Sequence, residues 1–203
     1  TYAESSPVTH TFMSLKYLIS REGTYKNSYD LTKTYQSGGI TLLKNEHYIP
    51  MGFMVNSDLL KWQVNKSEDQ FNPFDQQNEF FKLATGVSEN VYTQLEVVSQ
   101  GHTDYSQFPV NKLSYGNYSY NCTDTTTTPH LKWNYTAPYS GYVYVYADID
   151  GKDDVSFMIN DDSTNTQTLG MGRPYIACGG YVNEGDKISV YAELPQGQAG
   201  NAH

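Results

Sequence analysis

The feature that most constrains the fold is a series of short alternating apolar and polar segments that fills the chain after residue 87. Helical periodicity is absent there, and turn-forming sequences such as DGKDD, NDDSTN and NEGD separate several of the segments. Regular short strands of this kind are typical of antiparallel β structure. We therefore predict an antiparallel β-sandwich of jelly-roll type over residues 87–203. The predicted strands span residues 91–99, 112–121, 130–137, 141–149, 155–161, 175–182 and 187–194.

The segment GYVYVYADI at residues 141–149 has the clearest alternation. Successive side chains of a strand point to opposite faces, so this pattern places small apolar side chains on one face and tyrosines on the other. The apolar set is Val143, Val145, Ala147 and Ile149, and the tyrosine set is Tyr142, Tyr144 and Tyr146. The first set is expected to face the core.

The first third of the chain has a different pattern. Residues 12–20 and 39–45 each suit a short strand. Residues 48–56 contain Pro50, which indicates an edge strand or a strand that begins after the proline. Residues 58–62 suit a short helix or a turn. We predict a small mixed α/β portion over residues 1–86, so that the whole chain is mainly β within the α+β class.

The sequence NPFDQQNEFFKLATG at residues 72–86 predicts a capped helix over residues 73–85. Asn72 is a good N-cap, and Pro73 fits the first helical position, where its missing N–H has no partner to lose. Asp75 suits the positive end of the helix dipole, and Gly86 suits the residue that ends the helix.

Asn78 falls on the inward face of this predicted helix, between Phe74 and Phe81. Buried polar side chains are nearly always hydrogen-bonded. We therefore expect Asn78 to be buried and hydrogen-bonded to neighbouring backbone, and an exposed Asn78 would favour a ligand site instead.

Charge and composition exclude several classes of function. The chain has 203 residues with a formal net charge of −9, only 17% charged residues and 19 tyrosines. An acidic chain repels phosphate backbones, so nucleic acid is excluded as a partner, and it offers no basic patch for anionic lipid. No stretch reaches the ~18 apolar residues that a membrane span needs. The composition is typical of an extracytoplasmic β-rich protein.

Two cysteines, Cys122 and Cys178, lie far apart in the sequence. Their spacing does not match a zinc site. They either form one bridge in an oxidising compartment or serve as two small buried hydrophobic residues.

Two clusters are candidates for ligand binding. Trp62, Trp133, Tyr139 and Tyr142 could form an aromatic platform for sugar rings, although such residues also fill cores and sheet surfaces. The carboxylates of Asp148, Asp150 and Asp153 surround Gly151 and could ligate calcium, the one cofactor that the sequence suggests. The alternative for these aspartates is a solvated turn with Gly151 at positive φ.

No catalytic motif is present. The five histidines lack metal-ligand spacing, and the chain contains neither a nucleophile elbow nor a phosphate-binding glycine loop. We nominate no catalytic residue, and a soluble hydrolase is the least favoured function.

Three stretches, SLKYLIS, GGITLLKNEHYIPMGFMV and NPFDQQNEFFKLATG, resemble in order and spacing the distal part of the YfhO-type bacterial membrane proteins. The matching positions are Lys16–Tyr17, Asn45, Pro50–Phe53, Asn72–Phe74, Gln77–Asn78 and Gly86. SGYVYVYADI, VSFMIND and YIACGGYVNEGDKISV are similar, more loosely, to the closing β domain of that family.

The resemblance implies a polytopic membrane protein in which this portion lies on the extracellular face of the plasma membrane. It further implies glycosylation of Gram-positive surface polymers such as teichoic acids, with a polyprenyl-phosphate sugar donor and a GT-C-like enzyme. The catalytic carboxylates of such enzymes lie near the membrane helices, so none is carried over to this sequence. The absence of a hydrophobic span and of obvious natural ends leads us to expect a piece of a longer protein.

The expected function is that of a non-catalytic extracellular domain, which positions an acceptor polymer or braces the membrane part. Its expected partners are the membrane-embedded remainder of the same polypeptide and a cell-surface glycopolymer. The alternative is a stand-alone carbohydrate-binding or adhesive β-sandwich module.

Overall fold

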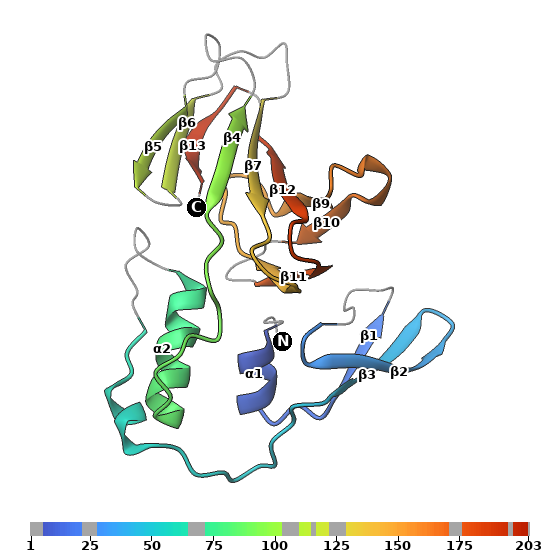
Figure 1. Ribbon diagram of the computed structural model, residues 1–203, viewed down its shortest axis with the longest axis vertical. Helices are drawn as coiled ribbons and strands as arrows, with labels where there is room; N and C mark the ends of the chain where they lie inside the picture. Colours follow the sequence, from blue (N-terminus) through green and yellow to red (C-terminus); the bar gives the residue numbers. More distant parts are fainter. Residues whose placement is uncertain are drawn as a thin grey trace. The chain divides into compact units, whose positions relative to one another are not determined.

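The computed structural model describes residues 6–21, 28–64, 72–102, 110–114, 117–121, 129–170, 176–194 and 197–202. The chain divides into two compact units, Tyr2–Gln94 and Leu95–His203, which we call the N-terminal and C-terminal units (Figure 1). The domain boundary that we predicted after Gly86 lies earlier in the chain than the observed boundary after Gln94. The mainly β class with antiparallel sheets is confirmed, whereas the sandwich packing and the jelly-roll connectivity stay predictions.

The N-terminal unit begins with a short helix, α1 (Pro7–Phe12). The strand predicted from residue 12 is therefore wrong in its first part, and β1 covers only Tyr17–Arg21. The reason is a start signal that outweighs the apolar pattern: Ser6 Oγ accepts the Thr9 N–H at 3.3 Å, and Pro7 occupies the first helical turn.

A three-stranded antiparallel sheet follows, with the order β1-β3-β2. β3 (Ile40–Asn45) confirms the predicted strand, whereas β2 (Leu31–Ser37) was not expected from its polar sequence. The strand predicted within residues 48–56 is wrong, because this segment is irregular. Pro50 has no N–H to pair, and Gly52 has a φ of 82° that no strand adopts. The short helix η1 (Ser57–Lys61) confirms the next prediction.

The predicted helix is confirmed as α2 (Pro73–Thr85). Asn72 Oδ1 accepts the Phe74 N–H at 2.9 Å, and Gly86 ends the helix in the left-handed conformation with a φ of 75°.

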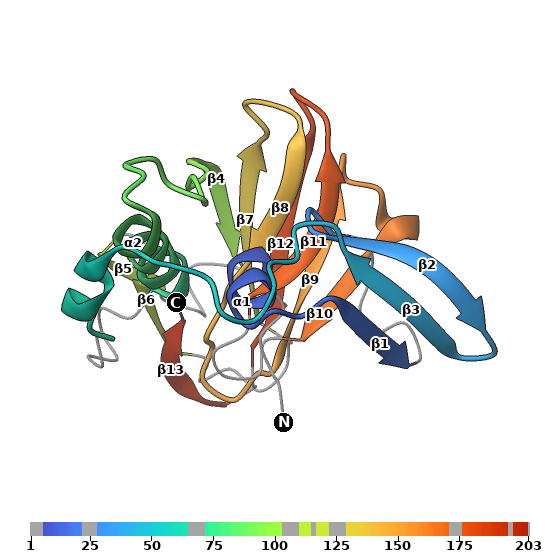
Figure 2. The same ribbon diagram turned by 90° about the horizontal axis from the view of Figure 1, so that it is seen from below.

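The C-terminal unit contains three antiparallel sheets among its described residues (Figure 2). The first has the order β10-β9-β12-β7-β4, the second pairs β11 with β8, and the third has the order β13-β6-β5. The strands are β4 (Val97–His102), β5 (Val110–Ser114), β6 (Asn117–Asn121), β7 (His130–Thr136), β8 (Gly141–Val145), β9 (Asp154–Ile159), β10 (Gln167–Gly170), β11 (Ala177–Val182), β12 (Lys187–Glu193) and β13 (Ala199–Ala202). A further short helix, η3, spans Ser163–Asn165.

Most predicted strands of this unit have a counterpart, with two corrections. The single strand predicted over residues 112–121 is instead the paired strands β5 and β6, and the strand predicted from residue 91 begins only at Val97. β10 and β13 are four residues each and include glycine, so their sequences carry little strand signal.

One hydrophobic core unites the three sheets of the C-terminal unit. It includes Val145, Ala147 and Ile149, which confirms the predicted inward face of residues 141–149. Phe157 of β9 is 0% exposed. A Cβ on Gly179 of β11 would lie 2.7 Å from the Phe157 ring, so the ring packs directly on the glycine backbone.

Candidate functional site

Tyrosines line one face of the β8–β11 pair. Tyr142 of β8 and Tyr181 of β11 are directly opposite in register, and their rings meet edge to face with centroids 5.3 Å apart. Tyr144 and Tyr146 follow at alternate positions on the side opposite the buried Val145 and Ala147. We call Tyr142, Tyr144, Tyr146 and Tyr181 the tyrosine face. Tyr181 is 54% exposed, and Tyr139, in the turn before β8, is 51% exposed.

The two tryptophans of the predicted platform are packed rather than exposed. Trp133 of β7 lies against the core, because it shares the strand face of the buried Leu131, and its ring is 5.6 Å from that of Tyr118. Trp62 belongs to the N-terminal unit and packs edge to face on Phe80 at 5.2 Å. Of the predicted platform, Tyr139 is exposed and Tyr142 is partly buried, and the structure adds the exposed Tyr181.

The acidic turn at residues 148–154 has the geometry of a tight turn. The Lys152 N–H donates to the Ile149 carbonyl at 3.0 Å, and Gly151 has a φ of 73°, as the turn alternative requires. Asp150 Oδ2 accepts the Asn201 N–H at 2.7 Å and therefore fastens β13 to the turn. Within the described part of the chain, no group of three or more His, Cys, Asp or Glu is placed to hold a metal. The calcium site at Asp148, Asp150 and Asp153 stays a prediction without geometric support.

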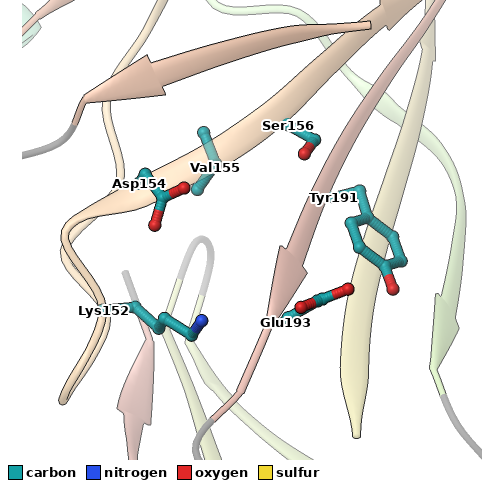
Figure 3. A pocket seen from close by; sticks show the side chains of 6 residues that line it. All are labelled: Lys152, Asp154, Val155, Ser156, Tyr191 and Glu193. Atoms are coloured by element: carbon teal, nitrogen blue, oxygen red, sulfur yellow. The ribbon is translucent and has the colours of Figure 1, made fainter. Parts of the chain in front are cut away.

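A small polar hollow lies on the five-stranded sheet (Figure 3). Its volume is about 60 Å³, and it is lined by Lys152, Asp154, Val155, Ser156, Tyr191 and Glu193. Figure 3 shows Lys152 and Asp154 on one side of the hollow and Tyr191 and Glu193 on the other. Sequence reasoning missed it, because β9 and β12 are separated by 27 residues and become neighbours only through sheet pairing, as in Ser156 opposite Tyr191.

The hollow combines an aromatic wall with hydrogen-bonding groups of both charges. The His130 ring packs on Tyr191 with centroids 5.0 Å apart. Burial raises the pKa of the Tyr191 phenol above its ordinary value of 10.0, and the nearby Glu193 carboxylate raises it further. The phenol is therefore a hydrogen-bond donor at neutral pH. These groups could hold a hydroxyl-rich ligand, although the hollow is too small for more than part of one.

The motif residues of α2 have structural roles. Asn78 is 6% exposed, its Nδ2 donates to the Tyr92 carbonyl at 3.0 Å, and its Oδ1 accepts the Tyr92 N–H at 2.9 Å. The prediction of a buried Asn78 bonded to backbone is confirmed. Phe74 contacts Tyr92 edge to face at 5.1 Å, and Asn72, Pro73 and Gly86 shape the helix ends.

The most enclosed contact between titratable side chains among the described residues of the N-terminal unit joins His10 to Asp30. His10 Nδ1 lies 2.6 Å from Asp30 Oδ2, and both residues are 1% exposed. Ser28 Oγ donates to the other Asp30 oxygen at 2.8 Å. The contact between His10 and Asp30 links α1 to the segment that leads into β2. Because both side chains are closed to solvent, a substrate has no access to them.

Cys178 lies on β11 opposite Tyr144 and is partly buried. Cys122 lies outside the described residues, so the predicted alternatives for the two cysteines stay open.

A family model described as bacterial membrane protein YfhO matches residues 1–200 of the chain. No curated protein and no solved structure matches the chain. No helix in the described ranges has the length and apolar character needed to cross a membrane.

Proposed function

Because the chain belongs to the YfhO family of bacterial membrane proteins, we propose that it is a non-catalytic extracellular domain of a membrane glycosyltransferase-like protein. Its C-terminal unit binds a cell-surface glycopolymer of the teichoic acid type and positions it as the acceptor. The match over residues 1–200 supports a region of a membrane protein over a stand-alone adhesive module.

The observation that carries this proposal is the tyrosine face together with Tyr139. Phenol rings offer an apolar face to the C–H groups of a sugar and a hydroxyl to its polar rim. Two of these rings are more than half exposed: Tyr181 on the paired strands β8 and β11, and Tyr139 in the turn before β8. A row of tyrosines can contact successive residues of a polymer without a deep pocket.

Charge determines how such a polymer would bind. The formal net charge of −9 opposes a phosphate-containing chain, so affinity must come from contacts with its sugars. Binding to an anionic glycopolymer is therefore expected to strengthen as salt is added, because salt screens the repulsion.

Calorimetry and NMR titration of the purified chain with teichoic acid and with neutral oligosaccharides test the proposal. The double variant Tyr142→Ala/Tyr181→Ala should weaken binding at least about tenfold, since an aromatic contact contributes roughly 0.5–1.5 kcal/mol beyond its buried area. The matched control is Tyr35→Ala, which removes a 63% exposed tyrosine from β2 of the N-terminal unit and should leave the affinity unchanged.

Absence of heat and of chemical-shift change with every polymer would contradict acceptor binding and leave the bracing role. Binding that survives the double variant unchanged would reject the tyrosine face and direct attention to the polar hollow.

A further inference from the structure

A segment of the N-terminal unit that is irregular except for η1 exposes large apolar side chains to solvent. We call residues 48–64 the apolar loop. Met54 is 99% exposed, Leu60 91% and Met51 88%. Tyr48, Phe53, Val55 and Val64 are each exposed by more than a third. Contiguous apolar exposure on this scale marks an interaction site.

The methionines are held in this position by contacts on either side of them. The ring of Phe53 packs edge to face on Phe12 of α1 with centroids 5.5 Å apart. The Asn56 N–H donates to the Ala84 carbonyl of α2 at 2.7 Å. Figure 1 shows no strand in the described part of the chain that follows β3 and precedes α2. Because the loop is held at α1 by the Phe53 ring and at α2 by the Asn56 backbone, the side chains of Met51 and Met54 project instead of folding inward.

Two charged pairs lie beside the loop, and the Lys16 ammonium lies over the Tyr48 ring with Nζ 5.5 Å from the ring centroid. Lys44 Nζ lies 2.8 Å from a Glu46 oxygen, and Lys61 Nζ lies 2.6 Å from an Asp58 oxygen. Neither pair leaves a net charge to attract or repel an anionic surface. A partner of the loop would therefore be recognised through apolar contact.

We propose that the apolar loop inserts Met51, Met54 and Leu60 into the headgroup–acyl boundary of a lipid bilayer. Three observations favour lipid over a protein groove. The chain belongs to a membrane protein family, and the projecting side chains are flexible and unbranched or singly branched. Met51 and Met54 stand on an irregular backbone instead of a regular helix or strand face, and Leu60 stands on the short helix η1.

The backbone also limits the depth of insertion. Unpaired N–H and C=O groups of an irregular segment cannot enter hydrocarbon, so the backbone stays at headgroup level and only side chains reach the acyl chains. The inference concerns the N-terminal unit and is independent of glycopolymer binding by the C-terminal unit.

Flotation of the purified chain with vesicles of phosphatidylcholine and of phosphatidylglycerol tests the inference. The chain should bind phosphatidylcholine vesicles with little change between low and high salt. It should bind phosphatidylglycerol vesicles more weakly at low salt than at high salt, because the net charge of −9 opposes an anionic surface and salt screens that repulsion. The double variant Met51→Ser/Met54→Ser removes two exposed apolar side chains and should reduce partitioning by roughly tenfold to a hundredfold. Leu60→Ser removes one such side chain and should reduce it by about tenfold. Val98→Ser is the matched control, because Val98 is 68% exposed on β4 and should have no effect.

A second readout reports the depth of insertion. Trp62 follows η1 directly and is the one tryptophan of the N-terminal unit. In a Trp133→Phe background, lipids brominated near the headgroup should quench Trp62 more strongly than lipids brominated near the chain end. Circular dichroism of each variant verifies that the fold is retained.

Absence of partitioning into either vesicle would overturn the inference. So would binding that high salt abolishes, or binding that the double methionine variant leaves unchanged. Concentration-dependent self-association that the same variant removes would identify a second copy of the chain as the occupant and would likewise overturn it. No glycopolymer is present in these assays, so their failure is distinct from failure of the proposed function.

Discussion

At the residue scale, Asn78 shows how one side chain can replace backbone pairing. Its amide bonds both the N–H and the C=O of Tyr92, so a residue in α2 fixes the irregular chain that follows the helix. Gln77, the preceding residue, accepts from Ser6 Oγ at 2.8 Å and thereby connects α2 to the N-cap of α1. The amides that give this stretch the look of a binding motif are used for internal attachment.

Replacing Asn78 with alanine should lower the free energy of unfolding of the N-terminal unit by about 2–4 kcal/mol, because two buried backbone groups lose their partners. Chemical denaturation followed by Trp62 fluorescence measures this change. Glu79→Ala, at the exposed neighbouring position, should alter stability by less than about 0.5 kcal/mol. An equal loss of stability in both variants would show that the Asn78 amide is not responsible, since alanine has a higher helix propensity than either residue.

Tyr191 provides a test of the polar hollow by titration. Its phenol has a raised pKa, so the neutral form is favoured in the folded state. The associated stability is fully present below pH 10.0, the ordinary value, and is lost as pH rises through the folded pKa. NMR titration of the ring carbons should show Tyr191 ionising above pH 10.0.

Glu193→Gln should move this pKa back toward its ordinary value without reaching it, since burial is the larger cause. If the substitution left the pKa of Tyr191 unchanged, the Glu193 carboxylate would not be a cause of its raised value.

At the element scale, the local sequence specifies where the helices begin and end more clearly than it specifies their apolar faces. Ser6–Pro7 begins α1 and Asn72–Pro73 begins α2, with the same Asx- or Ser-capped proline start. In both cases a local start signal decides where the helix begins. The strand prediction for residues 12–20 failed because it weighed the apolar pattern and overlooked this signal.

Gly86→Ala should destabilise the N-terminal unit by about 1 kcal/mol, because a φ of 75° is strained for any residue with a Cβ. The new Cβ would also lie 3.3 Å from Asn56 Nδ2. Thermal unfolding followed by circular dichroism at the helix band measures the effect. Gly39→Ala is the control: its Cβ would meet nothing within 4 Å, and a loss of similar size there would contradict the explanation.

At the scale of the whole molecule, the chain forms two compact units that each contain one of the two tryptophans. The C-terminal unit depends on close approach between sheets, most clearly where the Phe157 ring meets Gly179. Trp62 and Trp133 therefore report separately on the two units.

Gly179→Ala should destabilise the C-terminal unit by about 1–3 kcal/mol, because the added methyl group overpacks the core against Phe157. In denaturant titrations, the transition reported by Trp133 in a Trp62→Phe background should move to lower denaturant. The transition reported by Trp62 in a Trp133→Phe background should not move. A shift of both by the same amount would mean that the units unfold as one.

The sequence determined what depends on neighbours along the chain. Side-chain alternation at residues 141–149, the caps of α2 and the turn at Gly151 follow from local backbone preferences, and the burial of Asn78 follows from helical periodicity. The match of the motifs in order and spacing also sufficed to indicate the family. These features are short-range, so no knowledge of partner strands was needed.

Only the tertiary structure decided which distant residues share a surface. Pairing of β8 with β11 brings Tyr181 to Tyr142, pairing of β9 with β12 forms the polar hollow, and the strand face of Trp133 removes it from the predicted platform. The apolar loop likewise became visible only when Pro50 and Gly52 proved to keep its residues out of a strand. Sheet register is set by packing between residues far apart in the chain, and no local pattern in a single sequence reveals which strands will pair.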